Sequence, residues 1–199
     1  TALAVATGHK GKTGLRAVCV GREGHSALAP MALNALHLAC DFVAEIRAKQ
    51  AEIAANGRRD GDYDVPYTTL HVGRIEGGTA VNITAGECIF DWELRHLPGE
   101  DVEAMLAEID AHAERLVAPY RERAPEVAIR SERTVETVPS LGHGDRDPAI
   151  RLCQRLLGDE RASEAVAYTT EAGQFQSEGW PTVVCGPGSI GVAHQANEY

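Results

Sequence analysis

The chain has 199 residues, of which 44% are hydrophobic, and its formal net charge at pH 7 is −10. It can bury a sizeable core, but it is a poor partner for nucleic acid or an anionic membrane, because Lys and Arg must neutralise phosphate there. No apolar run approaches the roughly 20 residues that cross a bilayer, and no charged-then-apolar leader opens the chain. We therefore expect a cytoplasmic protein that binds small molecules or proteins, with no nucleic acid and no membrane.

The first two-thirds of the chain alternates strand and helix patterns. Period-two patterns predict strands over 15–20, 67–75, 87–95 and 126–132. Apolar residues at helical spacing predict one helix over 31–56 and a second that opens at 98–101. From residue 14 to 132 the order is β-α-β-β-α-β, the ferredoxin-like arrangement in which two helices cover one face of a four-stranded antiparallel sheet. We expect the other face to be free for a partner.

The last third has shorter units joined by loops. Asp147-Pro148 caps a helix that runs to Leu157, and short buried strands are predicted over 165–168 and 181–185. This alternation indicates an α/β layer distinct from the preceding unit.

Three polar residues lie at or beside strand ends in the first unit. His25, between Gly24 and Ser26, is either a loop histidine bonded to backbone or a proton donor that stabilises an anion. Arg95 is either a solvated surface charge or a guanidinium that binds a substrate carboxylate through two hydrogen bonds. Asn82 lies on a turn between strands, where its ordinary role is turn chemistry.

The closing segment, 185–199, is rich in glycine and contains His194 and Glu198. Gly186–Gly191 has the spacing of a dinucleotide fingerprint, but the residues that follow read as loop rather than helix. His194 is a structural histidine or a metal ligand, and a zinc site needs more ligands than this stretch contains.

Six ordered motifs are similar to those of the metallopeptidase family that includes acetylornithine deacetylase, succinyl-diaminopimelate desuccinylase and aminoacylases. They are Gly8-His-Lys-Gly11, Gly24-His25-Ser26, Gly77-Gly78-x-x-x-Asn82, Leu94-Arg95-x-Leu-Pro-Gly99, Tyr168-x-Thr170-Glu171-Ala172 and the closing Gly186-Pro-Gly-Ser-Ile-x-x-Ala-His194-Gln-x-x-Glu198-Tyr199. The similarity covers the whole chain, and the order of the motifs most resembles the deacetylase branch.

The resemblance implies an α/β zinc-hydrolase catalytic domain with an inserted ferredoxin-like lid that also forms the dimer. On this basis 1–11 ends one catalytic-domain segment, 12–132 is the lid and dimerisation domain, and 133–199 is the truncated C-terminal part of the catalytic domain. The fold class is then α+β followed by α/β. The implied reaction removes the acetyl group from N-acetylornithine, in arginine biosynthesis, through a metal-activated water.

The resemblance also implies roles for individual residues. His25 would stabilise the tetrahedral oxyanion in the partner subunit's active site, so the enzyme would be a homodimer through the lid. Asn82 and Arg95 would hold the carboxylate end of the N-acyl amino acid, Thr170 would line the pocket, and His194 would ligate one of two zinc ions, with cobalt as a possible replacement.

The family's other metal ligands and its general-base glutamate match nothing in this chain. Because one imidazole cannot hold a catalytic zinc, we expect the 199 residues alone to be inactive and to bind metal weakly or not at all. Two alternatives stay open: a dimerisation or regulatory ferredoxin-like binding module, and a relative that hydrolyses another N-acyl amino acid such as succinyl-diaminopimelate.

Overall fold

A four-stranded antiparallel sheet forms the larger part of the computed structural model, which describes residues 1, 3–142, 148–158, 164–188 and 191. The strand order is β4-β6-β2-β7. The strands are β2 (Gly11–Val20), β4 (Thr69–Gly77), β6 (Glu87–His96) and β7 (Ala128–Val138). The predicted ferredoxin-like order is thereby confirmed.

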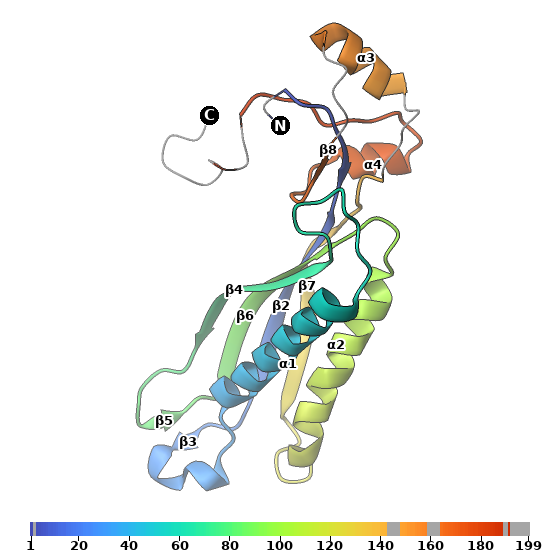
Figure 1. The fold of residues 1–199 in the computed structure, drawn as a ribbon. Helices are drawn as coiled ribbons and strands as arrows, with labels where there is room; N and C mark the ends of the chain where they lie inside the picture. The colour runs from blue at the N-terminus through green and yellow to red at the C-terminus, as the bar shows by residue number, and fades with distance from the viewer. Residues whose placement is uncertain (2, 143–147, 159–163, 189–190, 192–199) are drawn as a thin grey trace.

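Two long helices cover one face of this sheet, α1 (Ala35–Asn56) and α2 (Val102–Val117), and the opposite face is open (Figure 1). The core lies between the helices and the inward side chains of the strands. It includes Phe42, Ile46, Leu106 and Ile109 from the helices and Cys88, Phe90, Trp92 and Leu94 from β6. The alternation along β6 therefore buries the four residues that its period-two pattern predicts, and it leaves charged side chains on the open face.

The start of α1 differs from the sequence prediction. Residues 26–31 form a separate 3-10 helix, η1 (Ser26–Met31), and α1 begins only at Ala35. The cause is a cap: Asn34 has an extended backbone, and its side-chain oxygen accepts a hydrogen bond from the Leu36 N–H at 2.9 Å. A second short 3-10 helix, η2 (Ala118–Tyr120), follows α2.

Short segments at one end of the sheet form what we call the tip, residues 23–31 and 78–86. It contains β3 (Gly24–His25), η1 and β5 (Ile83–Thr84), and β3 pairs antiparallel with β5. Figure 1 shows the tip at the bottom, beyond the ends of α1 and β2.

The opposite end carries a second, smaller unit. Its strands β1 (Ala6–His9) and β8 (Glu164–Val166) are parallel. Helix α4 (Ala172–Ser177) lies beside β8, and α3 (Pro148–Leu157) lies farther out, at the top of Figure 1. The strand predicted over 181–185 is wrong. Only Val184 pairs, in an isolated antiparallel bridge to Ala6, and Pro181 has no N–H to extend a ladder.

The predicted domain limits at 11/12 and 132/133 stay predictions. β7 continues past residue 132 to Val138 without a break in its assignment. No helix in the described part of the chain is long and apolar enough to span a membrane.

Candidate functional site

The tip brings His25 and Asn82 together, although 56 residues separate them in sequence. His25 pairs with Ile83 across β3 and β5, and the backbone N–H of Ser26 donates to the Asn82 carbonyl at 2.9 Å. Both side chains are exposed. Two of the residues proposed from sequence therefore share one small surface.

The hydrogen bond made by His25 determines which ring nitrogen carries its proton. Nδ1 accepts a hydrogen bond from the backbone N–H of Ala27 at 3.1 Å and so caps the start of η1. An accepting Nδ1 in a neutral imidazole places the hydrogen on Nε2. His25 thus has the backbone-bonding role expected of a loop histidine, and it also presents an outward Nε2–H donor.

The surface around these two residues is unusually apolar for an exposed loop. Leu28 is 57% exposed, Met31 75% and Val81 101%. Exposed apolar side chains gathered around a polar group are typical of surfaces that contact another protein. The tip has this character.

Arg95 lies at the opposite end of the sheet, where β6 ends. Its Nε donates to Glu93 at 2.7 Å, and Lys12 lies 3.0 Å from the same carboxylate. Burial would raise the pKa of Glu93, but the bonds from Arg95 and Lys12 outweigh it and hold the pKa below its ordinary value. Within the described part of the chain, no residue accepts a hydrogen bond from the two terminal nitrogens of Arg95.

Thr170 borders the same end of the molecule. It lies in the turn between β8 and α4, is half-buried, and its hydroxyl oxygen accepts the N–H of Ala172 at 3.1 Å. Thr169 donates to the carbonyl of Lys10 at 2.7 Å, and Arg95 pairs in register with Lys12. We call this region the junction: residues 9–12, 95–97 and 168–173. His194 lies outside the described residues.

The candidate residues therefore form two groups, His25 with Asn82 at the tip and Arg95 with Thr170 at the junction. β6 has 10 residues, Arg95 is the ninth of them, and the tip lies before the first. Because a strand rises about 3.3 Å per residue, the groups are about 30 Å apart. Figure 1 shows β3 and β5 of the tip at one end of the sheet and β8 and α4 at the other. A substrate the size of an amino acid cannot contact both groups of one protomer.

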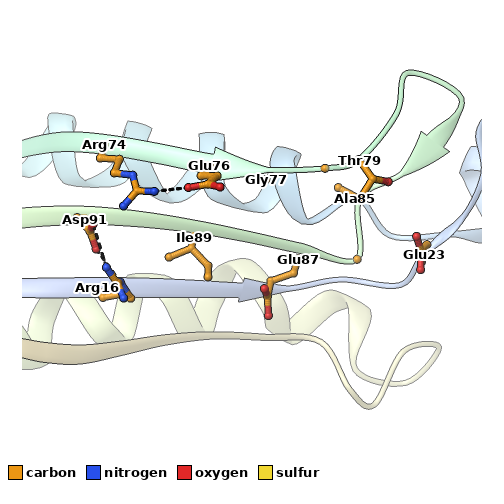
Figure 2. Close-up of a pocket in the computed structure, with 12 residues that line it drawn as sticks. Arg16, Glu23, Arg74, Glu76, Gly77, Thr79, Ala85, Glu87, Ile89 and Asp91 are labelled. Atoms are coloured by element: carbon orange, nitrogen blue, oxygen red, sulfur yellow. Dashed lines mark hydrogen bonds and ion pairs between the residues drawn. The ribbon is translucent and has the colours of Figure 1, made fainter.

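A groove of about 610 Å³ lies on the open face of the sheet near the tip, without His25 or Asn82 in its lining. Figure 2 shows that its arginines are already paired. Arg16 makes two hydrogen bonds to Asp91, at 2.8 and 3.1 Å, and Arg74 bonds to Glu76. The bonds from Arg16 lower the pKa of Asp91. Because these charges are neutralised by each other, the groove is a charged outer face rather than a ready anion site.

The described residues hold no group of three or more His, Cys, Asp and Glu side chains that could bind a metal ion. They do not fit the metal centre that the resemblance implies. No catalytic step through a metal follows from the residues placed here.

Two buried histidines at the junction were given no role by the sequence reasoning. His9 is 0% exposed and His96 is 6% exposed. His96 Nδ1 bonds to the Leu97 carbonyl at 3.1 Å, and no described residue bonds to its Nε2. The Gly8-His-Lys-Gly11 motif marked His9, but one of the two hydrogen-bond partners of its ring, the Gly173 N–H, comes from the far end of the chain.

Comparison with known proteins decides the family. Residues 7–121 match the model described as the peptidase dimerisation domain. The chain belongs to the peptidase dimerisation domain family.

Curated relatives of this chain are named acetylornithine deacetylase. The protein from Myxococcus xanthus is 34% identical over 179 residues, which are 90% of this chain and 45% of the relative. The protein from Erwinia tasmaniensis is 30% identical over 199 residues, all of this chain and 50% of the relative. The chain thus spans about half the length of these relatives.

Solved structures support the fold of the dimerisation domain. The Bacillus cereus aminopeptidase PepT gives a TM-score of 0.66 at 23% identity, covering 92% of this chain and 45% of its own. A Staphylococcus aureus tripeptidase gives 0.65 at 19% identity, covering 98% and 48%. These identities establish similarity of fold only.

The buried histidines of the junction predict a loss of stability in mild acid. Burial lowers the pKa of both His9 and His96 below the ordinary 6.5. The unfolded chain then takes up protons that the folded chain refuses, so the free energy of unfolding falls as pH decreases below 6.5. Urea denaturation at pH 7 and at about pH 5.5 measures this change. His9→Gln should reduce the pH dependence, whereas His37→Gln, on the exposed surface of α1, should not.

Proposed function

We propose that this chain is part of a metal-dependent amidohydrolase that removes the acetyl group from N-acetylornithine and acts as a homodimer. The observation that carries the proposal is the division of the candidate residues between the tip and the junction, in a chain of the peptidase dimerisation domain family. One protomer separates the two groups by about 30 Å. A second copy that inserts its tip beside the first copy's junction would reunite them.

In this arrangement each group has a chemical task that suits its structure. The outward Nε2–H of His25 would donate to the oxyanion formed when water attacks the amide carbonyl. The amide of Asn82, next to it, would hold the substrate from the same side. The terminal nitrogens of Arg95, which bond to none of the described residues, are suited to the substrate carboxylate, since a guanidinium binds a carboxylate through two parallel hydrogen bonds. Thr170 would line the pocket at the junction.

The apolar character of the tip supports contact with a second protein chain. Leu28, Met31 and Val81 expose large side chains to water in the single protomer. Their burial against a partner would be favourable by about 25 cal/mol for each Å² of apolar surface removed from water. The partner is a second copy, because the family model that matches residues 7–121 is a dimerisation domain.

The metal ligands of such an enzyme must lie largely outside the described residues. We therefore predict that the purified 199-residue chain holds less than one tightly bound zinc ion and has no deacetylase activity. Metal analysis after gel filtration at neutral pH is the measurement. Stoichiometric zinc that survives gel filtration would contradict the prediction.

The substrate is tested in a chain completed with the part of the Myxococcus xanthus relative that these 199 residues do not cover. Turnover of acetylornithine that exceeds turnover of succinyl-diaminopimelate supports the proposal. Equal or reversed preference would favour a relative that acts on another N-acyl amino acid. A completed chain that binds metal and dimerises but hydrolyses neither compound would favour a dimerisation or regulatory module.

A further inference from the structure

A closed ring of hydrogen bonds surrounds the base of the turn that carries Thr170. The hydroxyl of Thr169 donates to the Lys10 carbonyl at 2.7 Å, and His9 Nδ1 bonds to that same carbonyl at 2.9 Å. On the other side of the ring, the backbone N–H of Gly173 donates to His9 Nε2 at 3.2 Å. The imidazole of His9 therefore connects the two ends of the turn, residue 169 and residue 173.

These partners allow only one form of the His9 ring. A carbonyl oxygen only accepts, so Nδ1 must carry a hydrogen, and a backbone N–H only donates, so Nε2 must be free of one. His9 is consequently the neutral Nδ1–H tautomer. A leucine would lose both bonds, whereas glutamine offers one donor and one acceptor of similar reach.

We propose that His9 is a positioning residue that fixes the turn from Thr169 to Gly173, and through it Thr170, by bridging the Lys10 carbonyl and the Gly173 N–H. The inference rests on the proposed function only where it gives Thr170 a substrate to contact. The bridge itself is a property of the 199-residue chain.

Other hydrogen bonds also hold the turn, from the Ala172 N–H to the Thr170 hydroxyl and from the Ser177 hydroxyl to the Gly173 carbonyl, but neither of them involves the Gly173 N–H. Gly173 is buried against the carbonyl of Pro139. A Cβ at this position would lie 2.1 Å from that carbonyl oxygen, so the backbone packs too closely here for any side chain. Glu171 and Thr170 face outward or lie half-buried. Without the His9 acceptor, the buried Gly173 N–H has no other hydrogen-bond acceptor in the described part of the chain.

Burial and the neighbouring groups shift the pKa of His9 in opposite directions. Burial lowers the pKa of His9 most strongly, His96 lowers it further, and Glu171 together with the Lys10 carbonyl raises it. Lys10 is itself buried, with its pKa lowered to about 8 by burial and by Arg95 against the raising effect of Glu100. Protonation of His9 at Nε2 would direct a hydrogen at the Gly173 N–H, so acid should loosen the turn.

The test uses the 199-residue chain and two measurements by NMR. The first reads the ¹⁵N shifts of the His9 ring, where a protonated Nδ1 and an unprotonated Nε2 are expected at neutral pH. The second follows exchange of the Gly173 amide hydrogen with solvent. His9→Leu should speed that exchange about tenfold, the effect of losing one buried hydrogen bond, whereas His9→Gln should keep it within about twofold.

Matched variants separate this role from general destabilisation. Thr169→Val removes the other side of the ring and should also speed Gly173 exchange, while His37→Leu on exposed α1 should leave it unchanged. In mild acid the protection factor of the Gly173 amide, the ratio of its intrinsic to its observed exchange rate, should fall in the native chain but not in His9→Gln. An Nε2–H tautomer, or unchanged Gly173 exchange in both His9→Leu and Thr169→Val, would overturn the proposal. Failure to hydrolyse acetylornithine would affect none of these readouts.

Discussion

Replacing Gly11 with alanine is expected to lower the free energy of unfolding by about 3 kcal/mol, a large share of the 5–15 kcal/mol of a typical domain. Gly11 pairs with His96 across β2 and β6, and an alanine Cβ would lie 2.0 Å from His96 Nε2 and 2.3 Å from Cε1. The ring cannot swing aside cheaply, because it is buried and Nδ1 bonds to the Leu97 carbonyl. Chemical denaturation of the two proteins measures the difference.

Two controls show whether the ring is the cause. Gly61→Ala, where no atom lies within 4 Å of the added Cβ, should change stability little. His96→Ala removes the ring, so the double variant Gly11→Ala, His96→Ala should be more stable than the sum of the two single effects predicts. Strict additivity would mean that the alanine acts on the backbone and not on His96.

The sheet and its two helices were predictable because their patterns are local. In β6 the side chains alternate between core and open face over the whole strand, and a period of two admits no other burial. The helix caps were harder to predict from sequence. Asn34 and Asp101 are both N-caps with an extended backbone, but only the structure shows that Asn34 starts α1 at Ala35 and not at residue 31. The apolar run at 181–185 failed as a strand because β1 offers it pairing at Val184 alone.

The separation of the candidate residues follows from the sequence as well. Asn82 precedes β6 and Arg95 lies near its end, so any reading that makes 87–95 one strand puts them far apart. The bridge made by His9 does not follow, since its partner Gly173 is 164 residues away. No periodicity links the two, and the resemblance marked both motifs without joining them. Contacts of this range depend on how β1 packs against α4, which only the folded structure supplies.

Mixed dimers should show that His25 and Arg95 serve one site from different subunits. In the completed chain, His25→Ala is expected to lower turnover by on the order of 10²–10³, the usual loss of one oxyanion donor, with metal content unchanged. Arg95→Ala should raise KM, because the substrate carboxylate loses the guanidinium that would bind it through two hydrogen bonds. Each variant alone would leave both sites of its homodimer defective.

Combining the two variants distinguishes the arrangements. If the tip of one subunit completes the junction of the other, each heterodimer has one site with native His25 and native Arg95, and one site with neither. At a substrate concentration well below KM, where Arg95→Ala sites also turn over slowly, a random equal mixture should then recover about a quarter of the native activity, since half of the dimers carry one working site of two. If His25 serves the site of its own subunit, every site lacks one residue and mixing restores nothing. Because about 30 Å of β6 separates the two residues within a protomer, we expect the recovery.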